Sequence, residues 1–135
     1  MAVSRNKEHE LIMISIYDAL IYISMGDEFS VEDVMSGVYS LPFEEIPLFS
    51  KEIVVKSLSH IDEIKAKYQA KMEKWLFSRL NSLEQAILLM SYAHMHYTDD
   101  NVDKSVVIDV AVRLAKKYLD RDDYKFVNAI LDNVL

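Results

Sequence analysis

The chain contains very few of the residues that interrupt helices. Two glycines and two prolines are distributed over 135 residues, and apolar side chains recur at intervals of three and four along nearly the whole length. This spacing places apolar side chains on one face of an α-helix, whereas a strand would need strict alternation. Scarce glycine and proline also disfavour a fold that depends on many tight turns. We therefore predict an all-α fold, a compact bundle of about seven helices that forms one domain over residues 1–135.

The predicted helices follow from this periodicity and from capping residues. The first covers 7–25, the second starts after a capping serine at Ser30, and the third covers 44–59 with Pro47 in its first turn. The fourth covers 62–80 and directs inward the apolar set Ile64, Tyr68, Met72, Trp75, Leu76 and Leu80. Caps at Asn81, at Asp103 and at Asp120 or Asp122 start the last three. The helix after Asn81 is apolar on nearly all sides, which is typical of the middle of a bundle.

Few residues support catalysis or metal binding. The chain has no cysteine, no glycine-rich phosphate loop and no nucleophile elbow. His94 and His96, beside Asp99 and Asp100, resemble a metal site, but residues two apart on a helix point to nearly opposite faces. We therefore expect no enzymatic activity, no metal site and no cofactor.

The amino-acid composition also indicates where in the cell the protein acts and which kinds of partner it can bind. No apolar run is long enough to cross a membrane, and the first ten residues mix acids with bases, unlike a signal peptide. Together with the absence of cysteine, this favours a cytoplasmic protein. The net charge of −7 argues against general affinity for nucleic acid, which comes mainly from Lys and Arg. An RNA or DNA contact would need a local basic patch, or a partner that supplies charge.

The segment 101–135 is the best candidate for such a patch. It contains two amphipathic helices joined by an acidic turn, and Arg113, Lys116 and Lys117 form one stripe near the end of the first. Favourable interaction with the helix dipole explains this stripe without a ligand. Basic residues beside an aromatic, as at Lys125-Phe126, are also what a nucleic-acid contact requires, although the helical spacing of Phe126 is compatible with a core position.

The same segment resembles a known family. Residues 104–116 read KSVVIDVAVRLAK and residues 125–132 read KFVNAILD, close to the approximate patterns KVAINEAVELAK and KFVNGVLD of the NusB family of bacterial transcription antitermination proteins. Upstream, Trp75 and Arg79-Leu80 ahead of Ala86-Ile87-Leu88 also resemble that family, as does Glu10 followed by Ile16-Tyr17. The resemblance extends over almost the whole chain and is strongest in its C-terminal half.

The resemblance implies an all-α fold of two helical subdomains and a non-enzymatic function. Family members bind boxA-like RNA together with a NusE-type small-subunit ribosomal protein, in a complex with other Nus factors and RNA polymerase that supports ribosomal RNA transcription. Some family members form a homodimer that hides the RNA surface. Carried over to this chain, the RNA-binding candidates are Arg5, Lys7, Tyr17, Asp122, Lys125 and Phe126. The partner-binding candidates are Lys74 and Glu84.

Some positions depart from the family pattern. Asn6 and His9 stand where the family usually has arginine, so we expect lower RNA affinity and a weaker dependence on salt. His9 would regain a charge only at mildly acidic pH. Leu89 and Val110 stand where the family often has Arg and Glu, so an ion pair of the family would here be an apolar contact.

Two alternatives to an RNA-binding antitermination factor follow. The acidic balance and the missing arginines favour a NusB-like protein-interaction adaptor with reduced or lost RNA binding. A NusB-like domain also occurs fused to RNA methyltransferases, and such a function would here need a separate catalytic partner. A steep loss of RNA affinity with salt would support the first function, and binding to a ribosomal protein without RNA would support the adaptor.

Overall fold

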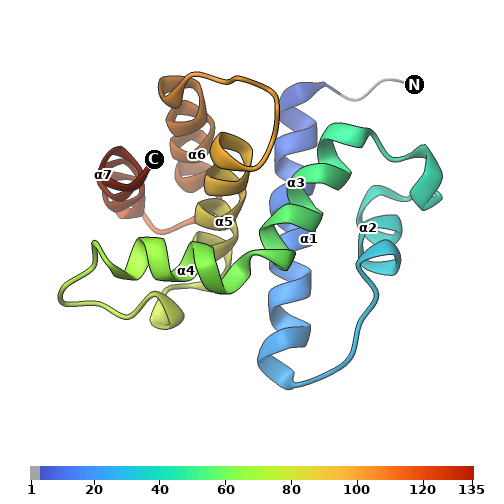
Figure 1. Cartoon of the computed structure of the whole chain (residues 1–135), viewed down its shortest axis with the longest axis horizontal. Coiled ribbons are helices and arrows are strands. Elements are labelled where there is room, and N and C mark those ends of the chain that lie inside the picture. The colour runs from blue at the N-terminus through green and yellow to red at the C-terminus, as the bar shows by residue number, and fades with distance from the viewer. Residues whose placement is uncertain (1–3) are drawn as a thin grey trace.

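The computed structural model describes residues 4–135, which form seven α-helices, two short 3₁₀ turns and no strand within that range (Figure 1). The elements are α1 (Arg5–Met25), α2 (Val31–Tyr39), η1 (Phe43–Glu45), α3 (Leu48–Ser59), α4 (Ile61–Gln69), η2 (Phe77–Arg79), α5 (Ser82–His96), α6 (Lys104–Tyr118) and α7 (Asp123–Val134). The predicted all-α class and the number of helices are confirmed.

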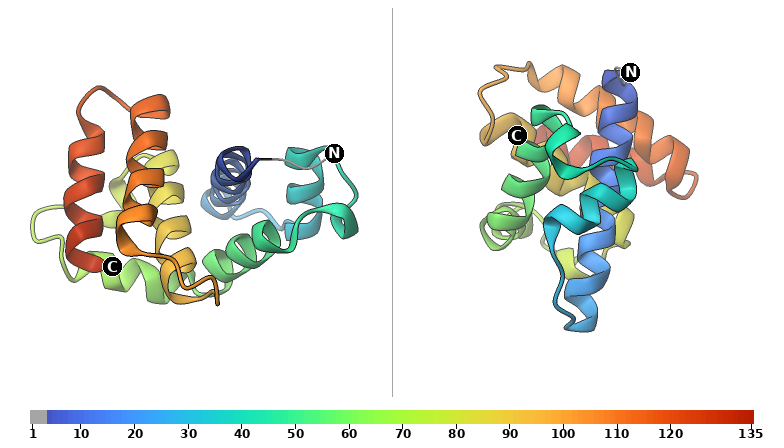
Figure 2. Two further views of the ribbon diagram at one scale, coloured as in Figure 1. Left: turned by 90° about the horizontal axis from the view of Figure 1, so that it is seen from above. Right: turned by 90° about the vertical axis from the view of Figure 1, so that its right-hand side faces the viewer.

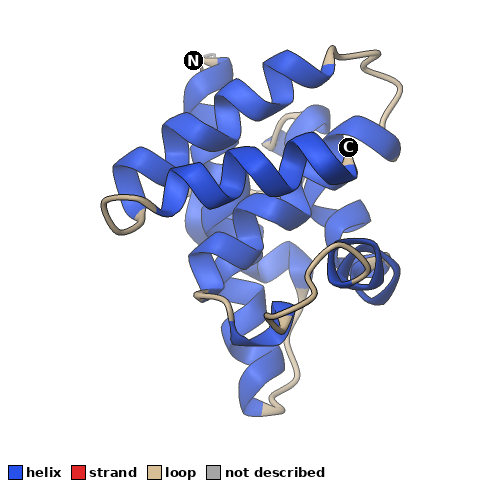
Figure 3. Cartoon of the chain, turned by 90° about the vertical axis from the view of Figure 1, so that its left-hand side faces the viewer, coloured by secondary structure: helices blue, strands red, loops and turns tan. Residues whose placement is uncertain are grey.

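The helices form two groups, with α1 to α3 in one and α4 to α7 in the other (Figure 2). Helix α5 packs against α1 and α3 of the first group and against α4, α6 and α7 of the second. Its residues from Glu84 to His94 are all buried, as predicted for the central helix of a bundle. Helices α6 and α7 run antiparallel and side by side on the outer face of the second group (Figures 2 and 3).

Short polar residues start several helices, as the sequence predicts. The Ser30 hydroxyl accepts a hydrogen bond of 3.3 Å from the backbone N–H of Asp33 at the start of α2. The Asn81 side chain accepts one of 2.8 Å from the N–H of Leu83 at the start of α5. Asp103 occupies the cap position of α6, but its side chain makes no capping hydrogen bond. Local hydrogen bonds therefore determine the starts of α2 and α5.

The third predicted helix is shorter than expected. Residues 43–45 form the separate turn η1, and Pro47 is the residue before α3 and not part of its first turn. Ile46 has an extended backbone, with ψ of 137°. The ring of a following proline disfavours the helical conformation at the preceding residue, so Pro47 keeps the turn and the helix apart.

The fourth predicted helix is also too long, because α4 ends at Gln69. The Gln69 amide nitrogen donates to the carbonyls of Met72 (3.1 Å) and Trp75 (2.8 Å), and its oxygen accepts a 2.8 Å bond from the N–H of Phe77. These bonds fold residues 70–76 into a loop. Met72 stays buried as predicted, whereas Trp75 is 66% exposed and Leu76 is 56% exposed, so their predicted inward positions are wrong.

Replacing Gln69 by alanine tests whether this side chain organises the loop. Three hydrogen bonds are lost at a partly exposed site, so we expect the free energy of unfolding to fall by about 1–3 kcal/mol. Urea denaturation measures the change, and Lys71→Ala in the same loop is the matched control with little expected effect. Equal stability of Gln69→Ala and Lys71→Ala would contradict the assignment.

Candidate nucleic-acid interface

The start of α1 lies beside the second half of α6. Arg113 donates a 2.9 Å hydrogen bond to the side-chain oxygen of Asn6, and Lys117 donates one of 2.9 Å to Glu10. A groove of about 350 Å³ between the two helices is lined by these four side chains, by Leu114 and by Lys7. Two hydrogen bonds between residues 107 positions apart in sequence therefore hold basic side chains of both helices on one surface, which we call the α1–α6 basic edge (Lys7, Arg113 and Lys117).

One carboxylate lies within this basic edge. Glu10 is 2.9 Å from Lys117 and 3.6 Å from Lys7. A hydrogen bond from Tyr118, together with the bond from Lys117, lowers the pKa of Glu10 to about 2, so it is ionised at neutral pH. Lys7 and Lys117 thus share one anion, and Arg113 is bonded to the neutral Asn6, so the edge keeps an excess of positive charge.

The predicted RNA-binding residues of α1 do not form one cluster. The Arg5 guanidinium lies 3.6 Å from the centroid of the Phe49 ring, so it is directed toward α3 and away from α6. Tyr17 is twelve residues further along α1, roughly 18 Å away along the axis, and is half-buried against the core. Of the three α1 candidates, only Lys7 belongs to the basic edge.

His9 is buried, and the expectation that it gains a charge at mildly acidic pH is wrong. Its side chain lies between the rings of Phe49 and His94, each at a centroid distance of 5.5 Å, and neither ring nitrogen has a hydrogen-bond partner. Burial, and then repulsion from His94, lowers the pKa of His9 to about 4. His9 therefore adds no cation to the surface where the family has arginine.

The two histidines of α5 point in different directions, as their spacing predicts. His94 is buried and its Nε2 atom lies 2.8 Å from a carboxylate oxygen of Asp100, whereas His96 is exposed. Within residues 4–135 there is no group of three or more His, Asp or Glu side chains that could hold a metal ion. The contact between His94 and Asp100 is best described as a structural one.

A second surface lies where the loop after α4 meets the start of α7. The exposed Trp75 and the half-buried Phe126 line two adjoining grooves. One, of about 470 Å³, includes Lys74, and the other, of about 420 Å³, includes Arg79 and Glu84. The structure therefore brings together Phe126, Lys74 and Glu84, which the sequence assigned to different roles. We call this surface the Trp75–Phe126 groove.

The remaining α7 candidates lie at the turn between α6 and α7. Lys125 and Asp122 are both exposed and form an ion pair of 3.6 Å. The Lys116 ammonium lies 4.7 Å from the centroid of the Tyr124 ring. The position predicted by helical spacing for the core is occupied by Val127, which is fully buried, and not by Phe126.

Sequence reasoning missed Trp75, Leu76 and Arg79 as surface residues. It assigned the two apolar ones to the inward face of a helix that in fact ends at Gln69. Helices usually end at glycine or before proline, and this loop contains neither. A single glutamine is no recognisable stop signal, so periodicity alone could not find this end.

Glu84 is an unusual carboxylate in the Trp75–Phe126 groove. It is 6% exposed, and no ion pair of the described residues includes it. Burial, and secondarily the nearby charge of Asp123, raises the pKa of Glu84 to about 7. Near neutral pH this side chain exists in both protonation states, so it can donate as well as accept a hydrogen bond.

Comparison of sequences identifies relatives of this chain. A family model described as the NusB family matches residues 38–135. The transcription antitermination protein NusB of Treponema denticola is 35% identical over 120 residues, which cover 89% of this chain and 80% of that protein. The protein of the same name from Macrococcus caseolyticus is 32% identical over 108 residues, which cover 80% of each chain.

Comparison of structures finds the same fold. A crystal form of T. maritima NusB superposes with a TM-score of 0.80 at 19% identity and covers 99% of this chain and 92% of that chain. A chain from a structure of the antitermination factors NusB and NusE in complex with dsRNA has a TM-score of 0.74 at 20% identity, with 96% and 94% covered. At these identities the likeness concerns the fold alone.

The raised pKa of Glu84 predicts a pH-dependent stability. Glu84 holds its proton more tightly in the folded state than in the unfolded state, where its pKa is near 4.5. Its contribution to the free energy of unfolding is therefore complete below pH 4.5 and is lost as the pH rises through 7. Glu84→Gln, which cannot ionise, should be more stable than wild type at pH 8, by on the order of 2 kcal/mol, and the difference should shrink at pH 5.

Thermal unfolding followed by circular dichroism at both pH values measures this difference. Glu73→Gln removes an exposed carboxylate from the loop beside the same groove and serves as the control, with no pH-dependent change expected. A gain from Glu84→Gln that is the same at pH 5 and pH 8 would show that Glu84 does not titrate near neutrality.

Proposed function

This chain belongs to the NusB family, and on that premise we propose that it is a transcription antitermination factor that binds boxA-like RNA together with a NusE-type ribosomal protein. In this role it would support ribosomal RNA transcription. The single observation that carries the RNA-binding part is the α1–α6 basic edge, which concentrates cations on one face of a protein with a net charge of −7. Phosphate contacts by Lys and Arg supply most of the sequence-independent affinity for RNA.

The RNA would extend from the basic edge to the turn before α7. Lys7, Arg113 and Lys117 would contact phosphates at one end, and Lys125 at the other. Unpaired bases would lie against Tyr17, because aromatic rings stack on bases that are free of a duplex. Phe126, which the sequence predicted for the same role, lines the Trp75–Phe126 groove, and we assign it to the protein partner instead. Arg5 is held over the Phe49 ring, so it would attract RNA through the positive electrostatic potential of this surface more than through a direct contact with the RNA.

The Trp75–Phe126 groove suits a protein partner. Interfaces are enriched in tryptophan, phenylalanine and arginine, and here Trp75, Leu76 and Arg79 present such a surface. We infer that the NusE-type protein binds here, with Lys74 and Glu84 at the margin. A weak RNA contact and a protein contact then combine in one complex with other Nus factors and RNA polymerase, and each strengthens the other.

We propose further that the protein is non-enzymatic, needs no cofactor, acts in the cytoplasm and behaves as one domain. No helix among the described residues has both the length and the apolar character needed to cross a membrane. Helix α5 packs against both groups of helices, which supports cooperative unfolding of the whole chain. A homodimer stays a prediction of the family resemblance.

A double substitution tests the RNA surface. Lys7→Gln with Lys125→Gln should weaken binding about tenfold or more for all RNA sequences, because lost phosphate contacts carry no sequence information. The slope of log affinity against log salt should also decrease by about 1–2. Fluorescence anisotropy with boxA-like and scrambled RNA measures both. The matched control is Lys65→Gln with Lys67→Gln on α4, and equal losses in the two variants would place the RNA elsewhere.

Trp75→Ala tests the partner surface. Because Trp75 is mostly exposed, the variant should fold normally but lose at least tenfold in affinity for the NusE-type protein, as expected of a central aromatic anchor. Leu48→Ala, on an exposed residue of α3, is the control. Isothermal titration calorimetry measures the affinity of both variants for the NusE-type ribosomal protein. Unchanged affinity in Trp75→Ala would exclude this groove.

An adaptor without RNA affinity is the second candidate function. It is favoured by the neutral, buried His9 and by the carboxylates of Glu10 and Asp122 beside the proposed phosphate contacts. Binding of the NusE-type protein alone, with no affinity of the complex for boxA-like or scrambled RNA, would establish it in place of the first function.

A further inference from the structure

The negative charge of this protein is concentrated in one part of the chain. Between Glu8 and Ser50 there are nine carboxylates and no lysine or arginine, whereas residues 51–135 carry thirteen basic and thirteen acidic side chains. This acidic stretch comprises most of α1, together with α2 and η1. This stretch therefore gives α2 and the second half of α1 a negative field, whereas Lys7, Arg113 and Lys117 form the basic edge at the start of α1.

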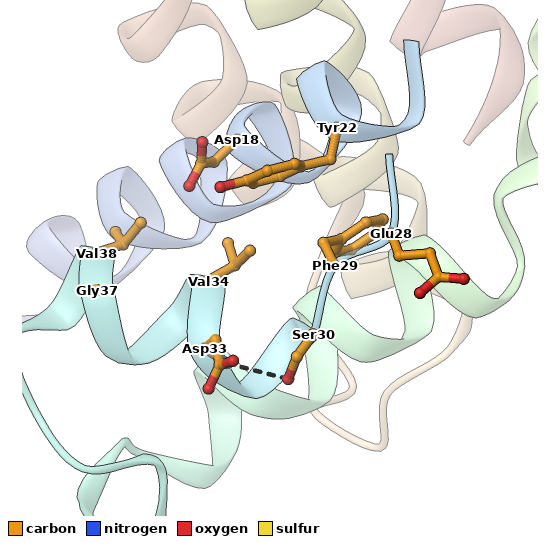
Figure 4. Close-up of a pocket in the computed structure, with 9 residues that line it drawn as sticks. All are labelled: Asp18, Tyr22, Glu28, Phe29, Ser30, Asp33, Val34, Gly37 and Val38. Carbon is orange, nitrogen blue, oxygen red and sulfur yellow. Dashed lines mark hydrogen bonds between the residues drawn. The ribbon is translucent and has the colours of Figure 1, made fainter. Parts of the chain in front are cut away.

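A groove lies within this acidic region, between the second half of α1 and α2 (Figure 4). It has a volume of about 560 Å³, and none of its nine lining residues is basic. Asp18 and Tyr22 project from α1 toward Val34 and Val38 on α2, which form an apolar floor (Figure 4). The groove thus combines an apolar surface with carboxylates at its margins.

An aromatic pair closes one end of the groove. The rings of Tyr22 and Phe29 stack with centroids 5.7 Å apart and an interplanar angle of 18°. Tyr22 is 36% exposed, and its neighbours Ile23 and Met25 are more exposed still. An aromatic face beside carboxylates attracts a guanidinium or ammonium group through both cation–π and ionic interactions.

The carboxylates of the groove are not neutralised by basic side chains within the part of the chain that the structure describes. No ion pair among residues 4–135 includes Asp18, Glu28 or Asp33. Asp33 lies in the first turn of α2, where its charge also favours the helix dipole. Asp18 lies within α1 and Glu28 before α2, so neither has this structural role.

Gly37 leaves room in the groove. Glycine destabilises a helix relative to alanine, yet Gly37 lies within α2 and lines the groove. A methyl group added there would meet no atom within 4 Å, so packing in this chain does not require glycine. The missing side chain keeps the groove open.

We propose that the α1–α2 groove docks a basic segment of a protein partner. An arginine or lysine of that segment lies against the Tyr22–Phe29 pair and is neutralised by Asp18, with Glu28 and Asp33 at the margins. An apolar residue of the same segment packs on the floor above Gly37. The charge of the groove excludes nucleic acid, so this contact is distinct from the RNA surface and from the Trp75–Phe126 groove.

A short peptide of defined composition serves as the probe. A fluorescein-labelled ten-residue peptide of alternating arginine and leucine should bind the full-length protein with a Kd below 1 mM, and its glutamate–leucine counterpart should not bind. Amide resonances of the ¹⁵N-labelled protein should shift mainly within residues 18–38. No binding of the arginine peptide, or shifts confined to other residues, would overturn the proposal.

Two variants separate docking from general attraction. Asp18→Asn with Asp33→Asn should reduce peptide affinity at least fivefold, whereas Glu44→Gln with Glu45→Gln, the same change of charge in the same acidic stretch but outside the groove, should alter it less than twofold. Equal losses in the two pairs would show that only the overall field attracts the peptide.

Filling the groove is the strictest test. Gly37→Leu should abolish peptide binding, keep a melting temperature equal to or above that of wild type because leucine favours a helix, and leave affinity for boxA-like RNA unchanged. Retained peptide binding in a folded Gly37→Leu variant would show that the groove is not the docking site. Failure of this proposal would leave the RNA and NusE-type contacts untouched.

Discussion

The burial of α5 on all sides is the constraint on which the rest of the structure depends. Every residue from Glu84 to His94 is buried, so neighbours must cover the whole circumference of the helix. Side chains from α3 and α4 also bind its backbone, since Ser57 donates to the Leu89 carbonyl at 3.4 Å and Tyr68 to the Leu88 carbonyl at 2.6 Å. Separating the two groups of helices would expose this surface, which explains why they are held together.

The functional surfaces are consequences of how helices assemble around α5. With α1 and α6 both packed on α5, Lys7 comes to lie beside Arg113 and Lys117, although α1 and α6 are far apart in sequence. Burial also changes the titration of two side chains that face the interior, because it lowers the pKa of His9 and raises that of Glu84. Surface charge is then separated into a basic edge at α1–α6 and an acidic groove at α1–α2.

The success and failure of the sequence predictions have specific causes. The starts of α2 and α5 were predictable because Ser30 and Asn81 cap them through local hydrogen bonds. The end of α4 was not, because Gln69 ends the helix through bonds to residues up to eight positions away. The exposed Trp75 therefore could not be predicted, and helical spacing alone could not decide between Phe126 and Val127 for the core position that Val127 takes.

The sequence by itself determined the helical class, most helix starts, the central position of α5 and the family, because these depend on periodicity, caps and local motifs. Only the tertiary structure decided which charged side chains lie next to one another and which ones are buried. Whether Arg5 faces RNA or stacks on Phe49, and whether His9 is a surface cation or a buried neutral ring, depends on contacts with helices distant in the chain. Such contacts leave no periodic signal, since they depend on the direction in which two packed helices present their side chains.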